Sequence, residues 1–292
     1  MKHFSSTVIP AYAKINLSLD ILGTLDNGMH RVETVMHTIS LTDTISLKVS
    51  ASGENKIVIE CKNKTIPLDE KNLVYKAAKL LLDDYPQKMC NIHFHIQKKI
   101  PVCAGLGGGS SDAAATIKGL NQAMSLNLSR SKLNDYAKQI GSDVPFLLHK
   151  GSCLATGTGT DLTMIKALSG VKAILINPGI FISTKNVYQM YDQCIIPDNS
   201  HPDTKSIVSA IETNNYQKLT EEMKNVLEIP VFKMHPEIAT IKKQLIDFGC
   251  DAALMSGSGS TVYGISRDAD LLESISKKFD PNQYKIYIVD LI

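Results

Sequence analysis

A cluster of glycines followed by two serines is the part of the sequence with the clearest chemical potential. Four of the five residues from 105 to 109 are glycine, although the chain has only 18 glycines in 292 residues. A strand-like segment, residues 91–97, precedes the cluster, and an alanine-rich helical segment, residues 110–123, follows it. Glycine lets a backbone approach a ligand closely, and the start of a helix favours phosphate. The segment therefore predicts a phosphate-binding loop.

Three well-known phosphate loops do not match this cluster. A P-loop requires a lysine after its last glycine, whereas Gly109 is followed by two serines. A dinucleotide-binding fingerprint requires a glycine where Ser110 stands and an acidic residue about 20 positions later, but residues 125–134 contain no acid. The run Asp247-Phe248-Gly249 spells the D-F-G of protein kinases, yet no H-R-D precedes it. The loop belongs to another class.

The elements that position this loop follow from hydrophobic periodicity and turn signals. The expected strands span residues 15–21, 32–49 with an interruption near Thr42 and Asp43, 56–60, 91–97, 146–148, 152–156, 171–177, 251–255, 260–265 and 285–289. The expected helices span residues 72–82, 110–123, 129–140, 184–191, 203–212, 216–224, 236–248 and 269–279. Strands first, and mixed strands and helices later, predict an α+β protein with two lobes.

Length and composition limit the function classes. A chain of 292 residues corresponds to about two domains, and we place them at residues 1–165 and 166–292. Lys plus Arg is 31 against Asp plus Glu 29, a net charge of +2 that favours no nucleic-acid partner. Six cysteines without a C-x-x-C pair favour neither a zinc site nor a disulfide framework. Without a signal-peptide pattern or a membrane-spanning apolar run, we expect a cytoplasmic protein without a membrane partner.

The glycine cluster resembles the phosphate loop of the GHMP kinases, the superfamily of galactokinase, homoserine kinase, mevalonate kinase and phosphomevalonate kinase. The superfamily pattern is P-x-x-x-G-L-G-S/G-S-S-A/D-A, and the chain has Pro101 followed by G-L-G-G-G-S-S-D-A-A from residue 105. Five other segments resemble this family in order: A-K-I-N-L from Ala13, G-M-H from Gly28, G-S-D-V-P-F from Gly141, N-P-G with S-T-K-N-V-Y from Asn177 to Tyr188, and M-S-G-S-G-S from Met255. The resemblance covers nearly the whole chain.

The resemblance implies a fold and a reaction. The fold would be a two-lobed GHMP kinase, with a ribosomal protein S5 domain 2-like N-terminal lobe and a ferredoxin-like C-terminal lobe. The reaction would be phosphoryl transfer from ATP, with Mg²⁺, to a small-molecule alcohol. The form of the loop is that of a branch that phosphorylates the 2-hydroxyl of a cytidylylated sugar alcohol in non-mevalonate isoprenoid precursor synthesis. We expect a monomer or a weak homodimer.

The same resemblance assigns roles to individual residues. Asp143 would accept the substrate hydroxyl proton, and Lys14 would lie beside it and offset charge on the moving phosphoryl group. The residues expected to bind ATP are Pro101, Gly105, Leu106, Gly107, Gly108, Gly109, Ser110, Ser111, Asn72 and Lys98. The residues expected to bind the other substrate are Asn16, Met29, His30, Thr184 and Tyr188. No metal ligand is assigned, although Ser111 is a candidate.

Plainer roles stay open for several of these residues. Asn72 could instead cap a helix, and Lys98 could be a solvated lysine. Met29 stands where the family has an aromatic residue, so its thioether would replace one stacking partner of the cytosine. Two alternative functions also stay open: a kinase of the same family acting on another alcohol, and a nucleotide-binding paralogue with little catalysis.

Overall fold

The computed structural model describes residues 4–292 as two compact units, each made from separate stretches of chain. The first unit contains residues up to Ala13, Leu41–Ile100 and Gly107–His149; the second contains Lys14–Ser40, Pro101–Leu106 and Lys150–Ile292. Two long strands, β1 (Phe4–Thr24) and β2 (His30–Ala51), contribute residues to both units. The placement of a domain boundary at residue 165 stays a prediction.

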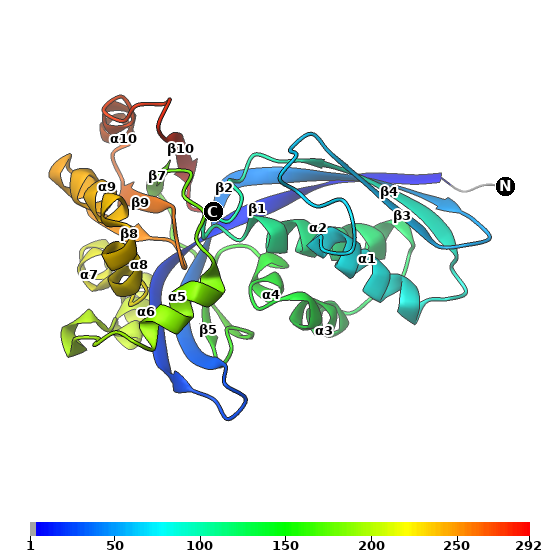
Figure 1. The fold of residues 1–292 in the computed structure, drawn as a ribbon, viewed down its shortest axis with the longest axis horizontal. Helices are drawn as coiled ribbons and strands as arrows, with labels where there is room; N and C mark the ends of the chain where they lie inside the picture. Colours follow the sequence, from blue (N-terminus) through cyan, green and yellow to red (C-terminus); the bar gives the residue numbers. More distant parts are fainter. Residues whose placement is uncertain (1–3) are drawn as a thin grey trace. The chain divides into compact units, whose positions relative to one another are not determined.

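The first unit packs helices against one face of a sheet (Figure 1). Strand β4 (Cys90–Gln97) pairs antiparallel with β2, from Thr44 opposite Gln97 to Ala51 opposite Cys90, and β3 (Lys56–Cys61) pairs parallel with β4. The helices are α1 (Leu73–Asp84), α2 (Gly108–Ala123), α3 (Arg130–Ile140) and α4 (Val144–Leu147). Helix α2 approaches the sheet closely at Gly119, where a Cβ atom would lie 2.4 Å from Cδ2 of Leu47 on β2.

The second unit contains two groups of strands. The first half of β2 pairs with β5 (Ser152–Thr156), which pairs with β6 (Asp161–Ile165). A separate antiparallel sheet has the order β10 (Lys285–Asp290), β7 (Lys172–Asn177), β9 (Val262–Ser266), β8 (Ala252–Met255). The helical elements are α5 (Thr184–Tyr191), a 3₁₀ turn at Asp198–Ser200, α6 (Thr204–Glu212), α7 (Tyr216–Glu222), α8 (Glu228–Met234), α9 (Pro236–Asp247) and α10 (Ala269–Ser276).

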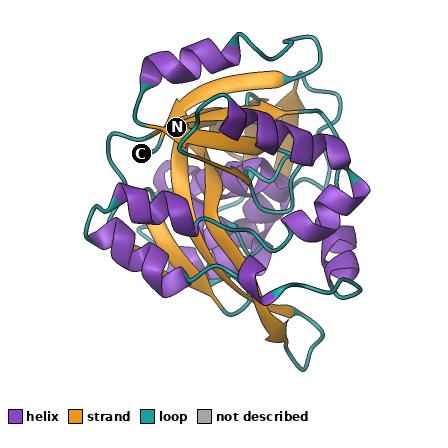
Figure 2. Ribbon diagram, turned by 90° about the vertical axis from the view of Figure 1, so that its left-hand side faces the viewer, coloured by secondary structure: helices purple, strands orange, loops and turns teal. Residues whose placement is uncertain are grey.

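A single hydrophobic cluster lies between the four-stranded sheet and its helices. Ile174 and Val262 from the sheet and Ile241, Leu245 and Leu272 from α9 and α10 are buried in it. Figure 2 shows the helices and strands of the chain coloured by type. Side-chain caps set several helix starts, since Ser183 accepts from Asn186 N and Asp203 from Ser206 N. Among residues 4–292, no helix has both the length and the apolar character needed to cross a membrane.

Two sequence-based expectations are wrong. Residues 146–148 were expected to be a strand, but they belong largely to the short helix α4, because Pro145 occupies a position at a helix start that proline favours. The expected interruption of β2 near Thr42 and Asp43 does not occur. The Asp43 carboxylate is buried and accepts hydrogen bonds from the backbone N–H groups of Lys99 and Ile100, so it serves a neighbouring segment instead of a turn.

Candidate active site

Helix α2 begins inside the glycine cluster, in the first unit. Gly107 precedes the helix with a φ of 70°, in the left-handed region that favours glycine. A Cβ atom on Gly108, the first helical residue, would lie 3.0 Å from Cγ2 of Ile100, so a side chain would crowd this backbone. The first N–H groups of an α-helix have no helical acceptor. This glycine-lined helix start therefore fits the phosphates of a nucleotide.

The two serines of the loop use their hydroxyl groups differently. Ser111 is buried, and its Oγ donates to the carbonyl oxygen of Tyr12 at 2.6 Å. Its oxygen therefore presents lone pairs, which suit a hard cation such as Mg²⁺ better than a phosphate. Ser110 is half-buried one residue earlier. Within residues 4–292, no group of three or more His, Cys, Asp or Glu side chains is placed to hold a metal ion.

In the second unit, the first half of the glycine loop contacts the segment that follows β8. Gly105 has a φ of 76°, and a Cβ atom on it would lie 1.9 Å from the carbonyl oxygen of Ser256. The Ser256 hydroxyl donates to the carbonyl oxygen of Gly105 at 2.9 Å. The N–H of Lys14 donates to the carbonyl oxygen of Leu106 at 3.1 Å. Pro101 and Leu106 are both buried, so they anchor this half of the loop.

Lys14 and Asn16 lie two residues apart on β1, on the same face of the strand. Lys14 Nζ donates to Asn16 Oδ1 at 2.6 Å, and Asn16 Nδ2 donates to Thr34 Oγ1 at 2.8 Å. Gly257 borders the same group, since a Cβ atom there would lie 3.3 Å from Lys14 Nζ. The structure therefore brings together two residues that the sequence assigned to different roles.

Asp143 lies in the first unit, where its backbone begins the short helix α4. Lys14 belongs to the second unit. The pairing of these two side chains stays a prediction.

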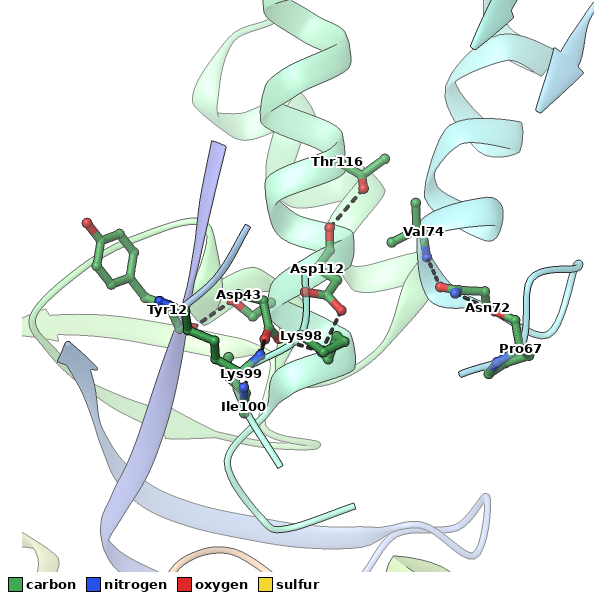
Figure 3. Close-up of polar contacts among 11 residues, drawn as sticks. Tyr12, Asp43, Pro67, Asn72, Val74, Lys98, Lys99, Ile100, Asp112 and Thr116 are labelled. Carbon is green, nitrogen blue, oxygen red and sulfur yellow. Dashed lines mark hydrogen bonds and ion pairs between the residues drawn. The ribbon is translucent and has the colours of Figure 1, made fainter. Parts of the chain in front are cut away.

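The two residues assigned to the adenosine both have partners in the first unit (Figure 3). Asn72 caps α1: its Oδ1 accepts from Val74 N at 2.9 Å, and its Nδ2 donates to the carbonyl oxygen of Pro67 at 2.7 Å. Lys98 is not a solvated lysine, because only 5% of its side chain is exposed and its Nζ bonds to Asp43 and Asp112. Burial raises the pKa of Asp112 to about 7, although the positive charge of Lys98 opposes this shift.

The residues assigned to the acceptor substrate all belong to the second unit, and two of them, His30 and Tyr188, are in contact. The rings of His30 and Tyr188 are 4.9 Å apart between centroids and tilted by 42°. His30 Nε2 lies 2.7 Å from Asp192 Oδ1. Thr184 Oγ1 and Ser258 Oγ are 2.9 Å apart, while the side chain of Met29 is exposed to solvent. The arrangement offers a flat aromatic surface beside an imidazole whose orientation a carboxylate fixes.

Comparison with known protein families decides the assignment. The profile of the GHMP kinases N terminal domain matches residues 72–151, and that of the GHMP kinases C terminal domain matches residues 207–286. The chain belongs to the GHMP kinase family. It is 44% identical to a 4-diphosphocytidyl-2-C-methyl-D-erythritol kinase of Bacillus licheniformis, over 87% of this chain and 86% of the relative. It is 41% identical to the enzyme of that name from Bacillus cytotoxicus, over 98% and 96% of the two chains.

Solved structures agree with the family assignment. A crystal structure of 4-(cytidine 5'-diphospho)-2C-methyl-D-erythritol kinase matches this GHMP kinase with a TM-score of 0.78 and 27% identity, over 97% of this chain and 98% of the other. A homoserine kinase from Cytophaga hutchinsonii matches with a TM-score of 0.79 at 18% identity, over 100% and 96% of the chains, and supports the fold alone. The two-lobed GHMP kinase fold and an ATP-dependent small-molecule kinase activity are therefore confirmed.

Four polar residues that support the loops of this GHMP kinase escaped the sequence analysis. Asp43 and Asp112 hold Lys98 in the first unit. Asn225 Nδ2 donates to the carbonyl oxygens of Met255 and Gly257, both at 2.8 Å, in the second unit. Glu228 Oε1 accepts from Met255 N at 2.8 Å. Asp112 lies inside the loop motif, but nothing in a single sequence marked the other three.

Proposed function

We propose that this GHMP kinase transfers the γ-phosphoryl group of ATP to the 2-hydroxyl of 4-diphosphocytidyl-2-C-methyl-D-erythritol, in the methylerythritol phosphate route to isoprenoid precursors. The observation that carries the proposal is the 40–45% identity, over 87–98% of the chain, to relatives that bear this activity in their names. The aromatic cluster of His30 and Tyr188 supports it, because stacking and an imidazole hydrogen bond suit a cytosine ring.

In the proposed mechanism, the helix start at Gly108 and the hydroxyl of Ser110 bind the triphosphate. The acceptor oxygen forms a bond to the γ-phosphorus, the bond between that phosphorus and the β,γ-bridging oxygen breaks, and ADP leaves. Asp143 orients the hydroxyl group and receives its proton, and Lys14 offsets the charge on the transferred group. The hydroxyl oxygen of Ser111 would hold Mg²⁺, and the ion would neutralise charge on the phosphate oxygens.

We place the enzyme in the cytoplasm as a monomer or a weak homodimer, acting on small molecules and not on nucleic acid. The near-neutral charge of the chain supports the part of this proposal that concerns nucleic acid, because nucleic-acid binding depends on a strong positive electrostatic field. The other substrate-side residues, Asn16, Met29 and Thr184, would line the acceptor position around His30 and Tyr188.

The test is an ADP-release assay with MgATP and a panel of the cytidylylated sugar alcohol, mevalonate and homoserine. Turnover of the cytidylylated compound alone is the expected result, and turnover of mevalonate or homoserine instead would replace the proposed acceptor. Asp143→Ala and Lys14→Ala should each lower kcat by at least about 100-fold while ATP still binds. Asp83→Ala, which removes an exposed carboxylate on α1, is the matched control and should leave kcat unchanged.

A further inference from the structure

Three charged side chains lie buried together in the first unit, where helix α2 begins (Figure 3). Asp43 comes from β2, Lys98 directly follows β4, and Asp112 lies in the second turn of α2. Lys98 Nζ bonds to Oδ2 of Asp43 and, at 2.7 Å, to Oδ2 of Asp112. The side chains are 0%, 5% and 6% exposed for Asp43, Lys98 and Asp112. We call these three residues the loop clamp.

The loop clamp joins the two ends of the glycine loop. Lys98 precedes residues 101–109 in sequence, and Asp112 follows them. Asp43 also accepts from the N–H of Lys99 at 2.5 Å and of Ile100 at 2.9 Å, so it fixes the backbone that leads into the loop. At the start of α2, a Cβ atom on Gly108 would lie 3.4 Å from Lys98 Nζ. The ammonium group of Lys98 therefore lies close to the backbone of the first helical residue.

The charges of the loop clamp do not balance when both carboxylates are ionised. Asp43 has three donors, whereas Asp112 Oδ1 has no hydrogen-bond partner among residues 4–292. The charged groups that act on the Asp112 carboxyl are Lys98, which stabilises its ionised form, and Asp43, which opposes it. Burial outweighs the attraction of Lys98 and raises the pKa of Asp112 to about 7.

We propose that the loop clamp positions the glycine loop for the triphosphate of ATP: Asp43 and Asp112 hold Lys98 between them and so fix the backbone on both sides of the loop. The proposal rests on the assignment of the α2 start as the phosphate site. Asp112 thus acts through the loop as a positioning residue and not as a catalytic residue.

The first test compares Asp112→Asn, which keeps the shape of the side chain, with the wild-type enzyme. The dissociation constant of MgATP is measured by calorimetry without acceptor and should rise about threefold, because a neutral amide holds the Lys98 ammonium group more weakly than a carboxylate does. Asp83→Asn, a change to an exposed carboxylate on the same unit, should leave the dissociation constant unchanged. An unchanged dissociation constant for Asp112→Asn would overturn the role of Asp112 in the loop clamp.

The second test opens the loop clamp at its other carboxylate. Asp43→Ala removes the acceptor of the Lys99 and Ile100 N–H groups, and it leaves Lys98 paired with Asp112. Thermal unfolding verifies the fold. The dissociation constant of MgATP should rise about tenfold, because the unclamped loop loses its preorganisation, while kcat at saturating ATP changes less than about threefold.

The outcomes of these tests separate the two proposals. A folded Asp43→Ala variant that binds MgATP as tightly as the wild type would overturn the loop clamp and leave the kinase assignment in place. Failure of the wild-type protein to bind MgATP would remove the assignment of the phosphate site itself. An equal loss of kcat and of affinity would also overturn the proposal, because it would place the loop clamp in the chemical step and not in positioning.

Discussion

The two glycine-containing segments of this kinase are held in place by different physical means. In the first unit, the start of α2 depends on two buried carboxylates that share one ammonium group. In the second unit, the segment after β8 is held by neutral groups, with the Asn225 amide and the Ser256 hydroxyl both donating to backbone carbonyl oxygens. The one carboxylate there, Glu228, has an ammonium partner of its own, Lys242 at 2.6 Å.

This difference has a consequence for function. Where buried carboxylates share one ammonium group, the position of a loop depends on their protonation, because adding or removing one proton changes the net charge of the buried group. Neutral hydrogen bonds and close backbone contact fix a loop by shape alone. We therefore expect the α2 start to respond to pH near neutrality and the segment after β8 to respond to changes of volume.

Gly105→Ala should cause the largest loss of stability, because the added methyl group would clash with backbone atoms in the second unit. The new Cβ would lie 1.9 Å from the carbonyl oxygen of Ser256, which is backbone and cannot swing aside, and the φ of 76° is strained for alanine. We expect a loss of at least about 4 kcal/mol in the free energy of unfolding, measured with urea, together with loss of ADP formation. Gly53→Ala is the matched control, since a Cβ there meets nothing within 4 Å. A loss below about 1 kcal/mol for Gly105→Ala would contradict this reading of the contact.

Local interactions could be predicted from the sequence, whereas interactions between residues far apart in the chain could not. The helix starts at Thr184 and Thr204 follow from the preceding Ser183 and Asp203, because a cap is a local interaction. Asp43 looked like a break in a strand because its partners Lys98 and Lys99 lie about 55 residues away and no local pattern reveals them. Ion pairs between residues far apart in the chain hold the glycine loop in the first unit. The glycines could therefore be predicted from the sequence, but the loop clamp could not.

The candidate site shows the same limit. The loop, His30 and Tyr188 were predicted from motifs, and the last two do lie together. Asp192, which bonds to His30, stands in no motif and could be found only from the structure. The pairing of Lys14 with Asp143 stays a prediction.

Protonation of His37 should destabilise the second unit in acid, in the direction opposite to the effect of Asp112. Its Nδ1 bonds to the carbonyl oxygen of Thr38 at 2.7 Å, and its Nε2 accepts from Leu168 N at 3.1 Å, so the buried ring must be neutral. Burial lowers the pKa of His37 to about 4 from 6.5. The stabilisation is complete above pH 6.5 and is lost as the pH falls toward 4, because the unfolded chain takes up the proton first. We expect this to cost about 3 kcal/mol of unfolding free energy.

The measurement is urea unfolding across this pH range for the wild type and for His37→Asn, whose amide can still donate to Thr38. Asp112 acts in the opposite direction over the same range, because its raised pKa stabilises the folded state as the pH falls. The slopes of the two proteins must therefore be compared with each other. His37→Asn should lose the His37 part of the acid destabilisation. Equal slopes for His37→Asn and wild type would contradict the assignment.

Ser256→Ala is the smallest expected effect and the finest test of the comparison between charged and neutral anchoring. The change deletes one hydrogen bond, from Ser256 Oγ to the carbonyl oxygen of Gly105, without adding volume or charge. We expect a loss of about 1 kcal/mol of unfolding free energy that stays constant with pH, because no group in this contact titrates. Ser274→Ala removes a similar hydroxyl-to-carbonyl bond on an exposed helix and should cost less. A loss that varied between about pH 6 and about pH 8.5 would show that the neutral segment is coupled to a proton after all, and the distinction between the two loops would fail.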